Sequence, residues 1–366
     1  MKQIVEKFAI EEDFVSATEY GSGHINVTYL VQMDKKYILQ KINTNIFQNA
    51  DELMENIVGV TTYLSEQIKQ RDGDCMRETL QVIPTKEGKS YWKDESNNCY
   101  RMYHFITDAT SFDAVESAKD FYESAVAFGN FQALLSEYPA ETLHETIPDF
   151  HNTGKRYKDF LKALEEDVCD RARDVQSEIE FVKAHAPETT YVTELLNKKE
   201  LPLRVTHNDT KLNNVMIDNI TGKGICVIDL DTVMPGSALY DFGDAIRFGA
   251  NTAVEDETDL TKVSLDLELF ELYAKGFLEG CQGRLTQQEI ELLPMGAKLM
   301  TLECGMRFLA DYLQGDIYFR IHREHHNLDR CRTQFALIKD MERKWKKMNQ
   351  IIHNLSIGTG QHQSDF

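Results

Sequence analysis

Residues 207–229 read HNDTKLNNVMIDNITGKGICVID and carry the strongest signal in the chain. The runs 214–217 and 225–230 are rich in apolar and β-branched residues, and the turn-forming run 219–224 separates them. The segment therefore predicts a β-hairpin. Its pattern is H-x-D-x-x-x-x-N, then strand, turn, strand and a further aspartate, Asp229. Because the two ends of a hairpin meet, the polar residues before the first strand and after the second are expected to share one site.

This pattern contains the parts that phosphoryl transfer from a nucleotide requires. Such a site needs a carboxylate that receives the proton of the acceptor hydroxyl, and oxygen ligands for Mg²⁺. We predict Asp209 as the catalytic carboxylate, and Asn214 and Asp229 as the Mg²⁺ ligands. Asp231 is a candidate for a further contact to metal or substrate. A loop aspartate is more commonly a cap or turn residue, but the strand, turn, strand and aspartate that follow argue against coincidence.

The residues around this hairpin are expected to hold its loop in place. His207 is predicted to orient the loop rather than to transfer a proton. Asp241 and Asp244 are predicted to anchor it. The triplet Asp-Phe-Gly at 241–243 imitates a metal-binding motif, but the metal aspartate should directly follow the second hairpin strand, as Asp229 does.

The first hundred residues predict an antiparallel sheet with one helix. Strand-like runs occur at 27–32, 36–42, 80–84 and 98–106, and residues 33–35 form a turn between the first two. Apolar residues recur at helical spacing through 51–69. From about residue 110 onward the chain reads as helices apart from the hairpin, so the fold class is α+β.

The N-terminal part also supplies candidate phosphate contacts. Gly21-Ser22-Gly23 precedes a strand, where backbone N–H groups can approach phosphates closely. Lys41 on the next strand is predicted to pair with phosphates, and Glu55, or alternatively Glu52, to hold that lysine. An exposed strand lysine is the ordinary alternative. The sequence contains no G-x-x-x-x-G-K-[ST] loop, and Gly-x-Gly lies between strands, which argues against a Rossmann site.

Composition narrows the class of protein. The 366 residues carry 60 acidic and 40 basic side chains, for a formal charge of −20. Such a field disfavours nucleic acid and anionic lipid, and no apolar run is long enough to span a bilayer. The N-terminus lacks the apolar block of a signal peptide, and the seven cysteines include no C-x-x-C pair. We therefore expect a cytoplasmic protein without disulfides or structural zinc, acting on a small molecule as a monomer or homodimer.

Three features of the helical half lead to further expectations. Thr286–Glu289 has the form of a capping box and predicts the start of a long helix. The charged run 340–347 predicts a solvated helix face. His322 and His326 have the spacing of a helical metal pair, but no third ligand is evident, so a solvated helix end is the preferred interpretation.

With these motifs in place, the chain resembles the aminoglycoside phosphotransferase and choline kinase superfamily, and within it the N-acetylhexosamine 1-kinases. The resemblance covers nearly the whole chain and rests on these segments: 21–26, 39–43, 54–57, 207–214, 227–236 and 305–319. It implies a bilobal protein-kinase-like fold, with a nucleotide-binding lobe over 1–106, a catalytic and substrate-binding lobe over 107–357, and a flexible tail over 358–366. It also implies ATP- and Mg²⁺-dependent phosphorylation of an N-acetylhexosamine at its anomeric hydroxyl.

The resemblance implies roles for further residues. His24, Arg307 and Tyr318 would contact the sugar, together with Asp209 and Asp231. The backbone of a hinge at 103–106 would bind adenine, and it includes these residues: His104, Phe105 and Ile106. Val27 departs from the family, which often has a polar residue at this position.

Two alternatives remain open. The acceptor could be another small hydroxyl compound, such as an aminoglycoside, choline, ethanolamine or homoserine. The protein could also be a non-catalytic ATP-binding regulator, although such proteins usually lose the base or a metal ligand and this chain has both. A protein substrate is disfavoured, because only residues 230–251 separate the metal aspartate from the next helical stretch and no Ala-Pro-Glu follows.

Overall fold

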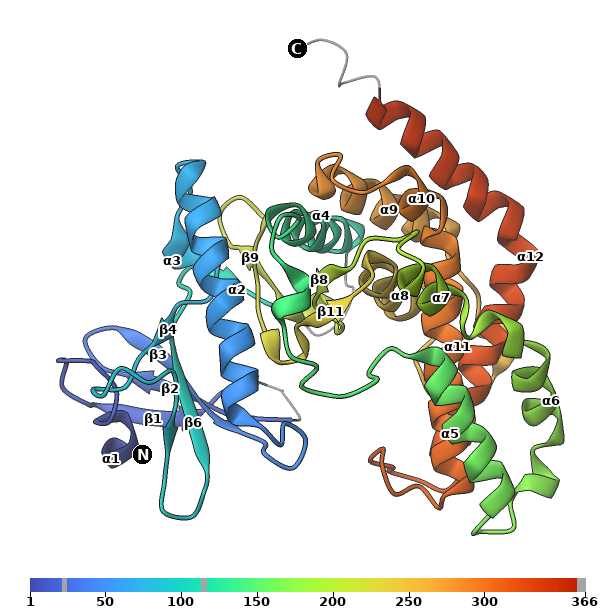
Figure 1. The fold of residues 1–366 in the computed structure, drawn as a ribbon, viewed down its shortest axis with the longest axis horizontal. Coiled ribbons are helices and arrows are strands. Elements are labelled where there is room, and N and C mark those ends of the chain that lie inside the picture. The colour runs from blue at the N-terminus through green and yellow to red at the C-terminus, as the bar shows by residue number, and fades with distance from the viewer. Residues whose placement is uncertain (22–24, 113–116, 361–366) are drawn as a thin grey trace.

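The computed structural model describes residues 1–21, 25–112 and 117–360. The predicted contacts at Ser22, Gly23 and His24 lie outside these residues. The N-terminal sheet is antiparallel, with strand order β1-β2-β3-β6-β4 and β5 paired to β6 (Figure 1). Its strands are β1 (Ser16–Glu19), β2 (Val27–Gln32), β3 (Lys36–Ile42), β4 (Val82–Ile83), β5 (Trp92–Lys93) and β6 (Cys99–His104). The prediction of an antiparallel sheet is confirmed.

The two faces of this sheet pack against different parts of the chain. Tyr37 and Leu39 of β3 pack in a small core with Val5 and Phe8, next to the short helix α1 (Lys2–Val5). Ile38 and Ile42 of the same strand pack in the main core with the helix α2 (Ala50–Gln70). We call the second face the inner face, because α2 lies between the sheet and the helical part of the molecule (Figure 1).

The predicted N-terminal helix is α2, and its start is set by a cap. The side chain of Asn49 accepts hydrogen bonds from the backbone N–H groups of Asp51 and Glu52. Its apolar stripe is buried as the spacing predicts, through these residues: Leu53, Ile57, Val60, Leu64 and Ile68. One further turn of helix, α3 (Cys75–Glu78), follows α2.

The rest of the chain is mainly helical. Its helices are α4 (Ala118–Leu134), α5 (Thr153–Glu166), α6 (Gln176–Ala184), α7 (Tyr191–Asn197), α8 (Ala238–Gly249), α9 (Leu267–Cys281), α10 (Gln287–Glu291), α11 (Leu293–Leu313) and α12 (His326–Gly360). The pair α4 and α9 packs closely because glycines meet at the crossing. A Cβ on Gly129 would lie 2.3 Å from the carbonyl oxygen of Phe277. The bilobal α+β fold is therefore confirmed.

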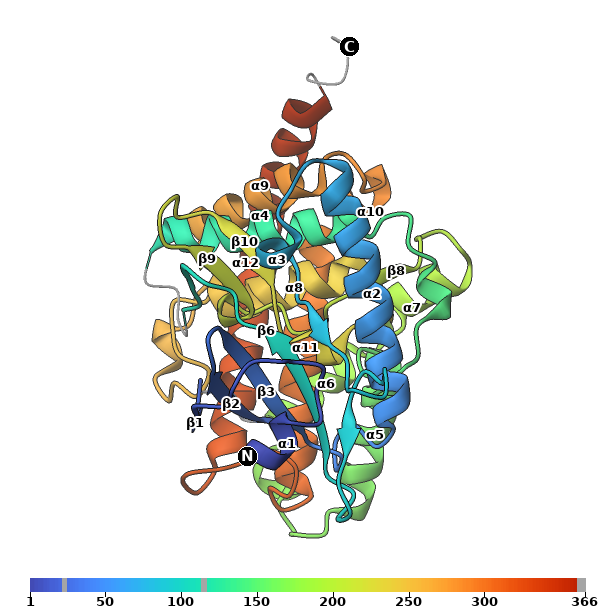
Figure 2. The same cartoon turned by 90° about the vertical axis from the view of Figure 1, so that its left-hand side faces the viewer.

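The predicted hairpin consists of β9 (Val215–Asp218) and β10 (Gly224–Val227), and it lies beside α4 (Figure 2). The strand β7 (Ala109–Thr110) adds to its edge. A second pair, β8 (Arg204–Thr206) with β11 (Met234–Gly236), joins the chain just before and just after this hairpin. Together the two pairs bring the segments 207–214 and 229–233 side by side.

Three expectations for the helical half are corrected. The capping box of Thr286 is present, but its helix α10 ends at Glu291, because Pro294 starts a new helix, α11. The charged run 340–347 is corrected at one residue only: Glu342, Arg343, Lys346 and Lys347 are exposed on α12 as expected. Asp340 is buried, and it accepts hydrogen bonds from Ser264 and from the backbone N–H of Leu265.

The histidine cluster is corrected at one residue: residues 322–325 are exposed just before α12, as expected of a solvated helix end, but His326 is not. His326 is buried at the start of α12, and its Nε2 lies 3.0 Å from Asp256. Its Nδ1 accepts a hydrogen bond from the backbone N–H of His322. Both ring nitrogens are therefore engaged within the protein, which leaves neither for a metal pair.

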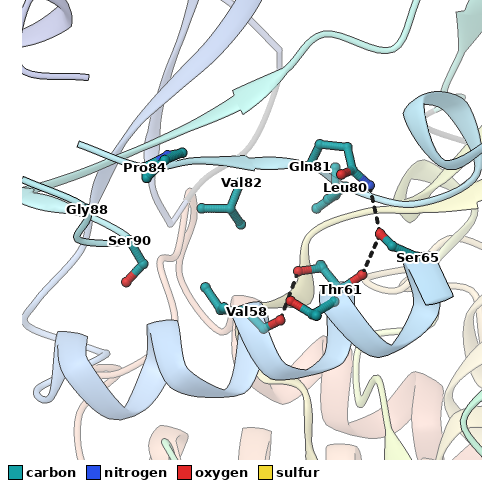
Figure 3. A pocket seen from close by; sticks show the side chains of 10 residues that line it. Val58, Thr61, Ser65, Leu80, Gln81, Val82, Pro84, Gly88 and Ser90 are labelled. Atoms are coloured by element: carbon teal, nitrogen blue, oxygen red, sulfur yellow. Dashed lines mark hydrogen bonds between the residues drawn. The ribbon is translucent and has the colours of Figure 1, made fainter. Parts of the chain in front are cut away.

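A hollow of about 290 Å³ lies between α2 and β4, where Val58, Thr61, Ser65 and Gln81 line it (Figure 3). Its polar groups bond to one another: Gln81 donates to Ser65 Oγ, and Ser65 donates to the carbonyl oxygen of Thr61. The hollow contains none of the predicted site residues.

Among the described residues, no helix is long and apolar enough to cross a membrane.

Candidate functional site

The segment 207–210 is held by one buried carboxylate. Asp241, in the first turn of α8, accepts hydrogen bonds from the backbone N–H groups of His207 (3.0 Å) and Asn208 (2.8 Å). The amide of Gln132 donates to the same side chain at 2.8 Å, and Thr210 Oγ donates to the carbonyl oxygen of Asp241. Burial raises the pKa of Asp241. The predicted anchoring role of Asp241 is confirmed by these contacts.

The buried His207 links this loop to the hairpin. Its Nε2 lies 2.9 Å from the carbonyl oxygen of Ile228, one residue before Asp229. Its Nδ1 accepts the backbone N–H of Asp209 at 3.3 Å. The ring therefore joins the two segments that carry the predicted aspartates and has no nitrogen left to shuttle a proton.

Asp209 is placed by two neighbours. Asn214 Nδ2 donates to the backbone oxygen of Asp209 at 2.8 Å and to its carboxylate at 3.0 Å. Lys211 Nζ lies 2.7 Å from the other carboxylate oxygen. Burial would lower the pKa of Lys211, but Asp209 and Asp244 outweigh it and raise that pKa. Lys211 was missed in the sequence, although a lone cation two residues after the predicted base was a visible signal.

Asp229 lies at the end of the hairpin with φ +57, in the left-handed region. Asp229 is a solvent-exposed residue, but desolvation by the protein around its carboxyl group, followed by the charges of Asp231 and Asp209, raises its pKa to about 6. Three carboxylates thus meet in one place, where they disfavour one another's charge.

These donors fit a hard divalent cation. The amide nitrogen of Asn214 is committed to Asp209, while across the described ranges no hydrogen bond uses its amide oxygen. Asp229 offers an exposed carboxylate. An amide oxygen and a carboxylate within a cluster of negative charge form the donor set that Mg²⁺ accepts.

Asp231 joins the two lobes. The Asn26 side chain at the start of the sheet donates to one of its carboxylate oxygens, and Arg101 of β6 forms an ion pair with the other. A further link comes from α2, where Asn56 Nδ2 donates to the carbonyl oxygens of His144 (2.8 Å) and Val233 (3.0 Å). The candidate site therefore spans both lobes.

The predicted pairing of Lys41 with Glu55 is wrong. Lys41 follows Leu39 by two residues, so it lies on the same face of β3, and it pairs with Tyr100 of β6; this is the outer face of the sheet, away from α2. The pKa of Asp94 is lowered mainly by a hydrogen bond from the Asn98 side chain and by hydrogen bonds from the backbone. The charge of Lys41 makes a smaller contribution in the same direction. Glu55 instead lies 2.8 Å from His144. Glu52 forms no ion pair with Lys41 among the described residues.

The predicted hinge, 103–106, covers the last two residues of β6 and the two residues that follow it. The backbone N–H of His104 donates to Gln81, and that of Phe105 donates to Lys36. Within the ranges that the structure describes, no hydrogen bond uses the backbone N–H of Ile106. The ring of Phe105 packs edge-on against Tyr20, directly before the glycine loop, at 6.0 Å between centroids. Within the described residues, the backbone N–H of Ile106 is therefore an unpaired donor at the hinge, which is what binding of a planar base would require.

Two of the residues predicted to contact a sugar, Arg307 and Tyr318, lie together. The guanidinium of Arg307 on α11 lies over the ring of Tyr318 at 5.9 Å, and over Phe150 (5.8 Å) and Phe319 (5.4 Å). Asp311 fixes this loop by accepting the backbone N–H groups of residues 317–319. The ring of Tyr318 is 69% exposed, so it is open to a ligand.

A second arginine adds positive charge here. Burial, followed by repulsion from Arg307, lowers the pKa of Arg156. Arg156 itself donates to the carbonyl oxygen of Phe150. The aromatic and cationic surroundings of Arg307 therefore differ from the carboxylate cluster around Asp229.

His151 connects these two regions. Its Nδ1 lies 2.8 Å from Glu303, one turn before Arg307 on α11, and its Nε2 lies 3.2 Å from the carbonyl oxygen of Asn208. Glu303 is also the acceptor of Thr153 Oγ at 2.7 Å. The pair is buried, with exposed fractions of 10% for His151 and 2% for Glu303.

We expect this pair to make stability depend on pH. Burial alone would lower the pKa of His151, but Glu303, Asp244 and the Asn208 carbonyl raise it above its usual value. A base with a raised folded-state pKa stabilises the fold fully below its unfolded pKa of about 6.5, and this contribution is lost as pH rises through the folded value. The difference in Tm between the wild type and His151→Gln should therefore be largest near pH ~6 and shrink toward pH ~9.

His353→Gln is the control for this experiment, because His353 is an exposed residue of α12. It should leave Tm unchanged relative to the wild type throughout. A gap between the wild type and His151→Gln that stays constant with pH would contradict the charged pair.

Comparisons with known proteins agree with this fold. The family model for the phosphotransferase enzyme family matches residues 16–271. A solved microcompartment-associated aminopropanol kinase superposes with a TM-score of 0.60 at 15% identity, over 95% of this chain and 97% of that chain. An aminoglycoside phosphotransferase from Alicyclobacillus acidocaldarius gives 0.57 at 10% identity, over 99% and 96%. A choline kinase from Cryptosporidium parvum gives 0.56 at 14% identity, over 94% and 93%.

Proposed function

This chain belongs to the phosphotransferase enzyme family and is a small-molecule phosphotransferase, and from that premise we propose that it phosphorylates the anomeric hydroxyl of an N-acetylhexosamine with MgATP. The observation that carries the acceptor is the contact of Arg307 with the exposed ring of Tyr318, since both residues belong to the segment 305–319 that resembles the sugar kinases. The nucleotide and the metal are supported by the carboxylate and amide cluster at the end of the hairpin.

The nucleotide would enter between the lobes. The backbone N–H of Ile106 would donate to the base, next to the ring of Phe105. The glycine loop that begins at Gly21 would cover the phosphates, consistent with the positive φ of +80 at that residue. Asn214 and Asp229 would hold Mg²⁺, which when bound would neutralise charge on the β- and γ-phosphate oxygens.

The acceptor would lie on the other side of Asp209. Two arginines near the aromatic cluster disfavour a polycationic aminoglycoside or a choline-like cation, because like charges repel at short range. A neutral sugar instead finds rings for its apolar face and guanidinium donors for its hydroxyl and acetamide oxygens. The neighbours that phosphorylate amino alcohols and aminoglycosides share this fold, so the acceptor is argued from the side chains of this chain.

In the transfer, Asp209 accepts the proton of the acceptor hydroxyl as the hydroxyl oxygen forms its bond to the γ-phosphorus. The bond from that phosphorus to the β–γ bridging oxygen breaks, and ADP leaves with the electron pair. Lys211 and Asn214 hold the carboxylate of Asp209 in position for this step. His207 and Asp241 hold the loop beneath it.

The proposal is tested by following ADP release with MgATP and a panel of free sugars, amino alcohols and aminoglycosides. We expect turnover with N-acetylglucosamine or N-acetylgalactosamine, and none with the corresponding 1-O-methyl glycosides, which lack the acceptor hydroxyl. In the same assay Arg307→Met should raise the KM of the sugar by about 10- to 100-fold and leave the KM of MgATP unchanged. Turnover confined to choline or kanamycin-type acceptors would overturn the proposal.

A further inference from the structure

One row of side chains on the inner face of the sheet points to an unassigned phosphate contact. Arg101 of β6 lies opposite Gln40 of β3, and Gln40 lies opposite Thr28 of β2. Both Nε and Nη2 of Arg101 donate to Gln40 Oε1, at 3.0 and 2.8 Å, and Gln40 Nε2 donates to Thr28 Oγ at 3.1 Å. On the inner face, the β3 position next to Lys41 therefore carries a neutral amide, and the cation of this row comes from the neighbouring strand.

Arg101 places a buried charge where the two lobes meet. Its side chain is only 1% exposed, and its remaining nitrogen, Nη1, forms the ion pair with Asp231 of the other lobe. Its guanidinium lies 5.4 Å from the ring centroid of Tyr103, the first residue of the predicted hinge. Its charge also acts on Asp229, the predicted metal ligand. A buried guanidinium is retained only where an anion faces it.

We propose that Arg101, rather than Lys41, is the cation of the N-terminal lobe that contacts the phosphates of a nucleoside di- or triphosphate. This inference deepens the proposed function and rests on it. Arg101 faces the carboxylate cluster around Asp229, whereas Lys41 lies behind the sheet, on the side of Tyr100. When the nucleotide binds, a phosphate takes the place of the Asp231 carboxylate beside Nη1 of Arg101. The guanidinium therefore has a charged partner both with and without the nucleotide. Its planar set of donors suits phosphate oxygens.

The test compares ligands that differ only in phosphate. Isothermal titration calorimetry of Arg101→Met should show MgADP binding weakened by about 10- to 100-fold, with adenosine affinity within about twofold of wild type. Lys41→Met is the matched control, an equal loss of charge on the adjacent residue of the paired strand, and it should leave both affinities within about twofold. Arg101→Lys, which keeps the charge without the planar donors, should fall between Met and wild type for MgADP.

Arg101→Met leaves the buried Asp231 without its cation, so the double variant Arg101→Met/Asp231→Asn provides a folded protein with the same lost contact. It should show the same selective loss of MgADP over adenosine. Equal weakening of adenosine and MgADP would reduce Arg101 to a structural role, and a loss confined to Lys41→Met would reverse the assignment; either result overturns the inference. If the wild type bound no MgADP, the proposed function itself would fail, an outcome distinct from unaltered binding by Arg101→Met.

Discussion

Asp209→Asn is expected to lower kcat by about 10³- to 10⁴-fold while MgADP affinity stays within a few-fold of wild type. The substitution keeps the shape of the side chain and one oxygen that can still face Lys211 (2.7 Å in the wild type). It removes the capacity to accept a proton from the acceptor hydroxyl, which is the role of Asp209 in the transfer. Because that capacity is used only during the reaction, kcat should fall without a matching change in KM. ADP release under saturating sugar measures the first effect, and calorimetry measures the second.

Asp259→Asn is the control for this substitution. Asp259 caps a short turn on the surface by accepting the backbone N–H of Thr261, and asparagine serves equally well as a cap. This variant should retain wild-type kcat. Near-wild-type turnover by Asp209→Asn would contradict a general-base role for Asp209.

The hairpin and its aspartates could be predicted because the information is local. A strand, a turn of six residues and a second strand necessarily return Asp229 to the neighbourhood of Asn214, and the structure confirms that geometry. The anchoring of the loop by Asp241 could be predicted for a similar reason, since it follows the hairpin by only a dozen residues. In each case the chain between the partners is short enough to restrict where they can lie.

The face of Lys41 could not be predicted in this way. The run 36–42 reads KYILQKI, in which both Tyr37-Leu39 and Ile38-Ile42 are apolar, so neither face is marked as the exposed one. An error of one residue in such a strand moves every side chain to the opposite face. Only the packing of α1 on one side and α2 on the other decides between Lys41 and its neighbour Gln40.

The contact between His151 and Glu303, which supports the acceptor region, could not be predicted from the sequence either. His151 and Glu303 lie 152 positions apart, and their contact depends on how α11 packs beside the segment that leads into α5. Neither residue belongs to a spaced motif. Lys211 is the opposite case, because it lies within the predicted loop and charge alone should have singled it out.

Asp229→Asn is expected to abolish productive metal binding, with kcat/KM lower by at least about 10³-fold at any attainable Mg²⁺ concentration. Of the two predicted ligands Asn214 and Asp229, only Asp229 is charged, and an amide replaces its carboxylate without the charge. Titration of ADP affinity with Mg²⁺ should show a strong dependence in the wild type and a weak one in the variant. Comparable ADP affinity with and without Mg²⁺ in the wild type would contradict this role.

Asp218→Asn separates the loss of a ligand from damage to the hairpin. Asp218 lies at the turn end of β9, where its carboxylate pairs with Arg77 at 2.7 Å and accepts the backbone N–H groups of Ile220 and Thr221. Losing this charge should lower Tm because it weakens the turn, but the dependence of ADP affinity on Mg²⁺ should be that of the wild type. If Asp218→Asn removed that dependence as fully as Asp229→Asn, hairpin geometry rather than metal ligation would explain both.

Asp229→Asn should raise the stability of the metal-free protein although it lowers activity. In the metal-free protein Asp229 faces the carboxylates of Asp231 and Asp209, and its backbone has the left-handed conformation that asparagine tolerates well. Removing the charge relieves repulsion without adding backbone strain, so Asp229→Asn should raise Tm when EDTA is present, where Asp218→Asn lowers it. A rise in Tm together with a loss of turnover would identify a cluster that is kept for its ligand at a cost to the fold. A fall in Tm would instead mean that Asp229 stabilises the fold without metal, contrary to the repulsion among the three carboxylates.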